Sequence, residues 1–137
     1  DVMKIFLTKF TPKFFATQGL SSSVYDQELA TSELANQFHE LTLMEGSRAA
    51  ILSMFGSRTD RSGFSGPSIF RDIVVPTLVI HGKEDNIIDV GSAKYFQENI
   101  PNVEVKIYEK IGHLPMYEAP KRTARDMKAF VESVRRG

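Results

Sequence analysis

Two side chains of this sequence, Asp85 and His113, have the chemistry of an acid–base pair. Asp85 lies in a charged turn directly after an apolar run, and His113 follows a second apolar segment and a glycine. A hydroxyl is a poor nucleophile at neutral pH, so acyl transfer needs an imidazole to take its proton and return it to the leaving group. The imidazole needs a carboxylate that fixes its tautomer and stabilises its charged form. We therefore interpret His113 as a candidate general base and Asp85 as the residue that orients it.

Each assignment has an alternative. Glu84 and Asp89 are rivals of Asp85 for the acid, and a carboxylate in a turn is most often only solvated. His113 could instead be a loop histidine without a catalytic role. The Gly-x-x-Asp spacing before Asp85 and the glycine before His113 favour the acid–base interpretation.

The surrounding segment predicts the elements that would position this pair. The apolar run 74–80 has the length and Val/Ile/Leu content of a strand buried on both faces. A helical pattern follows, with Asp89 as a candidate cap. Alternation over 103–108 predicts an edge strand whose face in water carries Glu104, Lys106 and Tyr108. Such a unit is right-handed, so its strands should be parallel and adjacent, with functional groups at their carboxyl ends. Asp85 and His113 are therefore expected at the same edge of the sheet.

The order of these motifs resembles the C-terminal end of an α/β-hydrolase. The motif Pro-Thr-Leu-Val-Ile-x-Gly-x-x-Asp ends at Asp85, and Gly-His-x-x-x-x-Glu-x-Pro follows after a helix and a strand. In that family the triad runs in the order nucleophile, acid and histidine, with the acid after the penultimate strand and the histidine after the last. The resemblance implies that Asp85 and His113 are this acid and histidine, and that Glu118 and Pro120 begin the final helix.

The predicted fold class is α/β: the C-terminal part of an α/β-hydrolase sheet, with two parallel strands, a crossover helix and a final helix, preceded by helical cap segments. By the resemblance, residues 1–55 form the helical cap, residues 56–73 a connection and residues 74–137 the C-terminal part of the core. Within the connection, residues 56–67 are polar and rich in glycine. An i, i+3, i+4, i+7 apolar pattern predicts the final helix over 120–136, packed across the sheet.

Helices are also predicted within the cap. Apolar spacing indicates helices over 1–19, 26–44 and 47–55, the second of them capped by Ser32 or Asp26. Concave apolar surfaces bind acyl and alkyl groups, so cap side chains are candidates for lining a substrate pocket, although each is more often an ordinary packing residue. These candidates are Phe10, Phe14, Phe15, Leu43, Met44 and Met54.

No nucleophile is predicted within the chain. The Gly-x-Ser-x-Gly elbow and the glycine-rich oxyanion loop, which the family carries on earlier strands, are not in the sequence. Ser65 lies near glycines, but their spacing is wrong, no strand precedes it and Pro67 opposes the helix that should follow. The nucleophile is therefore expected on an N-terminal complementary segment or a second chain, and this chain alone is expected to have little or no activity.

The remaining histidines do not indicate a metal site. His81 ends the first strand and is interpreted as packed near the site, and His39 falls on a helix as a surface or cap residue. Their spacing matches no metal motif, and no cysteine is present. No metal is expected, and no cofactor is implied because a triad supplies its own acid–base chemistry.

Composition excludes some partners. The 17 basic and 17 acidic residues balance, so no electrostatic attraction to nucleic acid or an anionic membrane is predicted. No apolar run approaches the roughly 20 residues of a membrane span. The first residues lack the shape of a secretory signal, which favours a cytoplasmic location, and the absence of an initiator methionine suggests a fragment. The exposed edges of a two-stranded sheet predict pairing with a complementary piece or a second copy, as in a homo-oligomer.

The sequence predicts the class of substrate but not its identity. Ile87, Leu114 and Met116 flank the proposed catalytic positions and are the candidate substrate-binding residues, and the predicted substrate is a small apolar carboxylic ester. The same acid and histidine would also serve a dehalogenase, a carbon–carbon hydrolase or a cofactor-free oxygenase. A non-catalytic binding or swapped module is a further alternative, because fold does not settle function.

Overall fold

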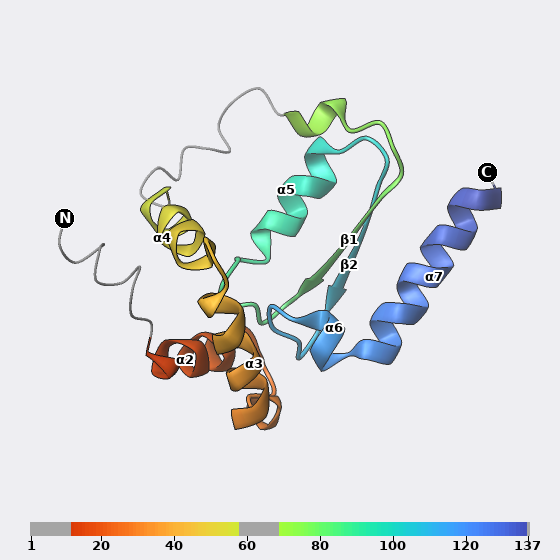
Figure 1. Ribbon diagram of the computed structural model, residues 1–137. Helices are drawn as coiled ribbons and strands as arrows, with labels where there is room; N and C mark the ends of the chain where they lie inside the picture. Colours follow the sequence, from red (N-terminus) through yellow and green to blue (C-terminus); the bar gives the residue numbers. More distant parts are fainter. Residues whose placement is uncertain (1–11, 58–68, 137) are drawn as a thin grey trace. The chain divides into compact units, whose positions relative to one another are not determined.

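The structure is a computed structural model, and it describes residues 12–57 and 69–136 of the chain (Figure 1). Phe10, Ser65 and most of the connection predicted at 56–73 lie outside the described residues.

The chain divides into two compact units. One lies within Asp1–Ser21 and Ala30–Gly66, and the other within Ser22–Leu29 and Pro67–Gly137. The second unit contains both candidate catalytic side chains, together with a short segment from the N-terminal third of the sequence.

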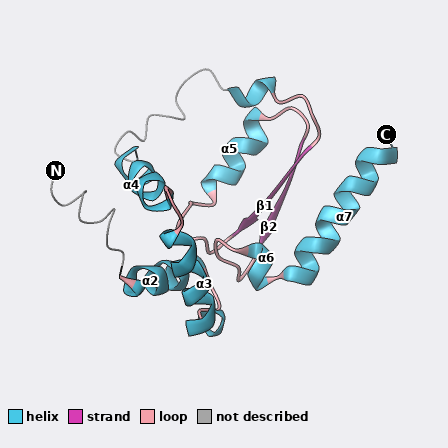
Figure 2. Ribbon diagram, viewed as in Figure 1, coloured by secondary structure: helices cyan, strands magenta, loops and turns pink. Residues whose placement is uncertain are grey.

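Helices form the described part of the first unit (Figure 2). They are most of α2 (Lys13–Ser23), α3 (Ser32–Leu43) and α4 (Ser47–Ser57). The prediction of one helix over 26–44 is wrong, because the chain forms a 3-10 turn, η1 (Gln27–Leu29), and enters α3 only at Ser32.

Two short polar side chains explain this break. Asp26 Oδ1 accepts the N–H of Glu28 at 3.0 Å, which favours a tight turn over a continuing helix. Thr31 has extended backbone angles, and its Oγ1 accepts the N–H of Leu34 at 3.2 Å. Thr31 is therefore the cap of α3, and neither Ser32 nor Asp26 takes that place.

The predicted strand–helix–strand unit is confirmed in the second unit. Strands β1 (Thr77–Gly82) and β2 (Val103–Tyr108) pair in parallel, and α5 (Gly91–Asn99) connects them (Figure 1). The register pairs Thr77 with Val103 and Gly82 with Tyr108, so both strands end at the same edge of the sheet. Asp89 is not the cap of α5, because Val90 takes that position, but Asp89 Oδ1 accepts the N–H of Gly91 at 2.7 Å.

The start of the first strand was predicted too early. Val74 and Val75 are 69% and 62% exposed, and the strand begins only at Thr77. Pro76 has no N–H to donate to a neighbouring strand, so the first bond of the ladder is that of the Thr77 N–H to the carbonyl of Asn102, at 2.8 Å.

Tyr108 was expected on the wet face of the second strand but is fully buried. Its hydroxyl donates to Asp126 Oδ2 at 2.6 Å, and the guanidinium of Arg122 lies 3.8 Å from the centre of its ring. Both partners belong to α7 (Pro120–Arg136), which follows the short helix α6 (Pro115–Glu118). The phenol is therefore buried with a partner for its polar end.

Helix α7 has the bounds predicted for 120–136, but Glu118, which was expected at its start, ends the separate helix α6. The burial of α7 also differs from the prediction. Thr123 and Asp126 are buried, whereas the apolar side chains of Met127, Val131 and Val134 are about half exposed. Neither α7 nor any other helix in the described parts of the chain is long and apolar enough to cross a membrane.

Candidate active site

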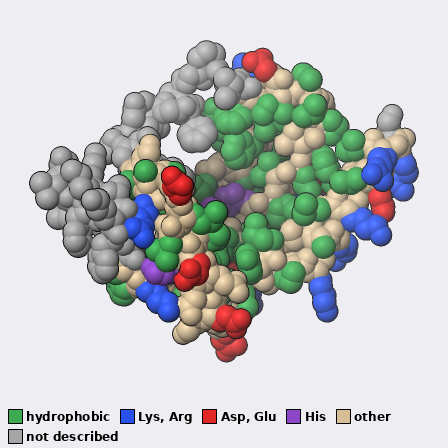
Figure 3. Space-filling model, viewed as in Figure 1, with side chains coloured by type: hydrophobic (Ala, Val, Ile, Leu, Met, Phe, Trp, Pro, Cys, Tyr) green, Lys and Arg blue, Asp and Glu red, His purple; other side chains and the backbone are tan. Residues whose placement is uncertain are grey.

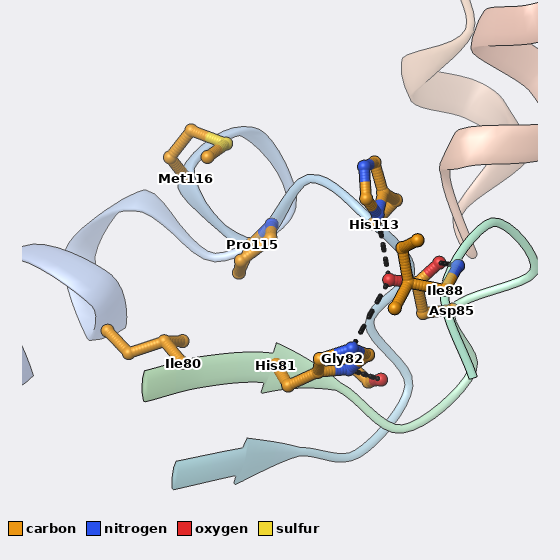
Figure 4. A pocket seen from close by; sticks show the side chains of 8 residues that line it. All are labelled: Ile80, His81, Gly82, Asp85, Ile88, His113, Pro115 and Met116. Atoms are coloured by element: carbon orange, nitrogen blue, oxygen red, sulfur yellow. Dashed lines mark hydrogen bonds and ion pairs between the residues drawn. The ribbon is translucent and has the colours of Figure 1, made fainter. Parts of the chain in front are cut away.

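The carboxylate of Asp85 is held by the turn that follows β1. Its Oδ1 accepts the backbone N–H groups of Ile87 and Ile88 at 2.7 and 2.9 Å. These two bonds fix the plane of the carboxylate and leave Oδ2 directed toward His113 (Figure 4). The Asp85 side chain is only 3% exposed, so it is oriented by the protein and not by water.

Burial and hydrogen bonding act on the pKa of Asp85 in opposite directions. Burial raises the pKa, because it removes water from the charged form. Hydrogen bonds from the Ile88 amide, from His113 and from the Ile87 amide lower the pKa and together outweigh burial. The pKa of Asp85 therefore lies below its ordinary value of 3.8, and the group is a carboxylate at neutral pH.

His113 lies in contact with this carboxylate. Its Nδ1 is 2.8 Å from Asp85 Oδ2. Because an ionised carboxylate can only accept, Nδ1 must donate, and the neutral ring then carries its lone pair on Nε2. Figure 4 shows Nε2 on the side of the ring that faces away from Asp85. The His113 side chain is 38% exposed, so this nitrogen can meet a proton from another molecule or segment.

The two loops that carry the pair touch through their backbones. The N–H groups of Lys83 and Glu84 donate to the carbonyls of Tyr108 and Ile111, at 2.8 and 3.1 Å. A side chain at Gly82 would overlap the backbone oxygens of the loop before His113. The glycine of the first motif is therefore needed for the close approach of the loops, and this approach brings Asp85 to His113.

Two further contacts fix the histidine loop, and sequence patterns did not predict them. The N–H of His113 donates to the carbonyl of Ser23 at 2.7 Å. Glu118 Oε1 accepts the N–H of Gly112 at 2.8 Å, and its Oε2 accepts the N–H of Tyr25 at 2.7 Å. Glu118 was noted only as part of a motif, and residues 22–29 were not connected with the site, because partners that act through backbone groups leave no pattern of side chains.

A pocket of about 230 Å³ opens beside the pair (Figure 4). Its lining combines Asp85 and the two nearby histidines with Gly82 and four apolar side chains, which are Ile80, Ile88, Pro115 and Met116. Of the three residues predicted to bind substrate, Met116 lies in this lining. Ile87 instead donates its N–H to Asp85, and Leu114 is half-buried at the start of α6.

His81 also contacts the candidate acid. Its Nδ1 lies 2.8 Å from the carbonyl oxygen of Gly82, and its Nε2 lies 3.7 Å from the Asp85 oxygen that binds His113. The interpretation of His81 as packed near the site agrees with this position. His39 belongs to α3 in the other unit. Within residues 12–57 and 69–136, no group of three or more potential ligands could hold a metal ion.

The sequence matches one known family over most of its length. The family model described as the alpha/beta hydrolase fold matches residues 11–120. Lipase 3 of Moraxella sp. (strain TA144) is 39% identical over 62 residues, which are 45% of this chain and 20% of that protein. The monoacylglycerol lipase ABHD6 of Homo sapiens is 34% identical over 76 residues, which are 56% of this chain and 23% of that protein.

A solved structure extends the likeness to the arrangement of the elements. The meta-cleavage product hydrolase CumD of Pseudomonas fluorescens IP01 superposes with a TM-score of 0.74 at 27% identity. The superposition covers 92% of this chain and 48% of that one. The chain therefore spans about half the length of this solved structure, and its matched stretches are less than a quarter of the two lipases.

Proposed function

This chain belongs to the α/β-hydrolase fold family, and we propose that it supplies the acid and the histidine of a Ser-Asp-His triad that hydrolyses carboxylic esters. The observation that carries the proposal is the 2.8 Å contact between Asp85 Oδ2 and His113 Nδ1, where two parallel strands end. Lipases among the similar proteins support the ester as substrate.

The geometry fits acid–base catalysis by His113. Nε2 takes the proton of a serine hydroxyl as the oxygen attacks the ester carbonyl, and it then gives the proton to the departing alcohol. Nε2 then takes a proton from a water molecule that attacks the acyl-enzyme, and it returns the proton to the serine oxygen as the carboxylic acid leaves. Asp85 keeps the proton of the neutral ring on Nδ1 and stabilises the imidazolium that forms between the two transfers.

The serine and the donors of the oxyanion hole come, in this proposal, from residues outside this chain. Apolar surface on the second unit supports a complementary segment or a second chain as their source. Hydrophobic side chains gather on the face of this unit that Figure 3 shows. Across the second unit as a whole, the exposed apolar residues include Val74, Val75, Met127, Val131 and Val134. A surface of this kind is typical of a site where other protein packs.

The pocket supports an apolar acyl or alkyl group as the part of the substrate that is bound. Ile80, Ile88, Pro115 and Met116 form its apolar wall beside His113. A strongly charged substituent placed against this apolar wall would lose water without finding a partner there. We therefore infer an apolar ester.

A second candidate is the hydrolysis of a meta-cleavage product. The structural match to CumD, over nearly the whole of this chain, favours this alternative. The same Asp85 and His113 would serve both reactions, so the site does not separate them. Turnover of a short-chain p-nitrophenyl ester compared with turnover of a meta-cleavage product would decide.

The first test is intact mass spectrometry of the native assembly after labelling with a fluorophosphonate, which reacts with activated serines. The proposal expects the label on a serine outside this chain and its loss in His113→Ala. His39→Gln is the matched control, since it changes a histidine of the other unit, and it should keep the label. An assembly that takes no label, or a His113→Ala variant labelled at the normal rate, would refute the proposal.

A further inference from the structure

Glu118 connects the loop of His113, which directly precedes it in the chain, to a segment of the second unit that lies 93 residues earlier in sequence. From α6, its Oε1 accepts the N–H of Gly112, and its Oε2 accepts the N–H groups of Tyr25 and Asp26 at 2.7 and 3.4 Å. The segment that contains Tyr25 also binds His113, the residue after Gly112, because the carbonyl of Ser23 accepts the N–H of His113 at 2.7 Å. Two consecutive amides of the histidine loop are thus held from one side.

The segment and the loop approach so closely at Gly112 that no Cβ atom fits between them. A side chain at Gly112 would lie 2.6 Å from the Ser23 carbonyl oxygen, 2.9 Å from the Tyr25 nitrogen and 3.1 Å from Glu118 Oε1. The orientation of the amides before His113 sets the direction in which its side chain leaves the backbone. A shift of segment 22–29 would therefore turn the imidazole relative to Asp85.

Only an ionised carboxylate fits the centre of this arrangement. The N–H donors approach both oxygens, and a carboxylate offers two acceptors and no donor. Hydrogen bonds to a charged acceptor are also stronger than those between neutral groups. A glutamine would present its NH₂ group to one of these donors, and the loop or the segment would have to move away.

We propose that Glu118 is a positioning residue, which clamps segment 22–29 to the loop of His113 and thereby sets the Nδ1 to Oδ2 contact. This inference rests on the proposed function for its effect on catalysis. Glu118 is not among the residues that line the pocket. Loss of the clamp should therefore change kcat and leave KM nearly unchanged, because substrate contacts stay and the geometry of proton transfer does not.

The test compares Glu118→Gln with Glu109→Gln in the native assembly. Glu109 is an exposed carboxylate at the start of the same loop, where it pairs with Lys83, so the control removes the same charge from this loop without touching the clamp. Two properties are measured: ester turnover, and the NMR signal of the hydrogen-bonded Nδ1 proton of His113. The signal reports the contact with Asp85 whether or not the assembly turns over an ester.

Glu118→Gln should lower kcat between about tenfold and a hundredfold with little change in KM, and should weaken or broaden the Nδ1 proton signal. Glu109→Gln should change neither. An unchanged Nδ1 signal in Glu118→Gln would overturn the proposal. So would a kcat that returns to normal well below the melting temperature, since the role would then be stability alone.

Glu118→Asp provides the second variant if Glu118→Gln does not fold. It keeps the charge, but its shorter side chain cannot reach both the loop and the segment. Faster hydrogen exchange at the amides of Gly112 and His113, with β2 unchanged, is the expected result. Uniform exchange across the second unit would count against a local clamp. An altered Nδ1 signal in an assembly that takes no fluorophosphonate label would uphold the clamp and refute the ester hydrolase, so the two failures are distinguishable.

Discussion

Replacing Asp85 by Asn should reverse the hydrogen-bond roles at His113. Asp85 Oδ1 accepts two backbone N–H groups, from Ile87 and Ile88. In Asp85→Asn the side-chain oxygen must take this position, because an NH₂ group there would face two donors at less than 3 Å. The NH₂ group then occupies the place of Oδ2, 2.8 Å from His113 Nδ1, where an acceptor stood before.

The imidazole can avoid this clash by changing its tautomer. Nδ1 becomes the acceptor, and the proton moves to Nε2, the nitrogen that has to take a proton from the nucleophile. A triad whose acid is replaced by its amide loses about 10⁴-fold in turnover for this reason. This loss corresponds to about 5 kcal/mol in the activation free energy, and we expect an effect of this order for Asp85→Asn.

The assay measures kcat for a p-nitrophenyl ester in the native assembly, together with the ¹⁵N chemical shifts of His113, which distinguish the two tautomers. Asp89→Asn is the matched control, because Asp89 is exposed and the amide oxygen can still accept the N–H of Gly91. A loss of less than tenfold in Asp85→Asn, or a proton that stays on Nδ1, would refute the reasoning.

Three further predictions concern stability and are measured by denaturant or thermal unfolding. Gly82→Ala should destabilise the protein by about 1–3 kcal/mol or more, because its new Cβ overlaps backbone oxygens, whereas Gly19→Ala, with open space around it in α2, should stabilise it by about 0.5–1 kcal/mol. Tyr108→Phe should cost about 1–2 kcal/mol through the lost bond to Asp126. Burial, and then the hydrogen bond to Asp126, raise the pKa of Tyr108 above 10.0. The stability that this group contributes is therefore present below pH 10 and declines at higher pH. Tyr108→Phe should remove this decline. The lowered pKa of Asp85 has the opposite sign: its contribution is present above pH 3.8 and is lost as the pH falls through its folded value, so the acid limb of the stability curve should flatten in Asp85→Asn. Equal pH–stability curves for each variant and the parent protein would contradict the last two predictions.

Local patterns predicted the unit that carries the site. Apolar runs of strand length, a helical pattern between them and the right-handed crossover rule place two strands in parallel, and this placement brings Asp85 and His113 to one edge. The structure confirms that adjacency at 2.8 Å. Helix α7 was predicted to its end residues, because proline at its start and the apolar spacing are both local signals.

Contacts that depend on distant backbone groups were not predicted. Segment 22–29 touches the histidine loop through the carbonyl of Ser23 and the N–H of Tyr25, and every residue type except proline has both groups. The contacts of Glu118 were not predicted for the same reason. A motif can draw attention to a carboxylate, but which amides it binds depends on a contact with a segment 93 residues earlier in the chain.

The errors in predicted burial have opposite signs, and the difference is informative. Tyr108 was expected in water and is buried, because α7 supplies a partner for its hydroxyl. Val74, Val75 and the apolar stripe of α7 were expected to be buried and are exposed, and no surface in the described residues covers them. Fully burying a side chain of this kind contributes roughly 1.5–3 kcal/mol, so covering several of them would stabilise an assembly substantially. This pattern supports the proposal that the sheet and the final helix pack against further protein. In that proposal, the same protein would bring the nucleophile to Nε2 of His113.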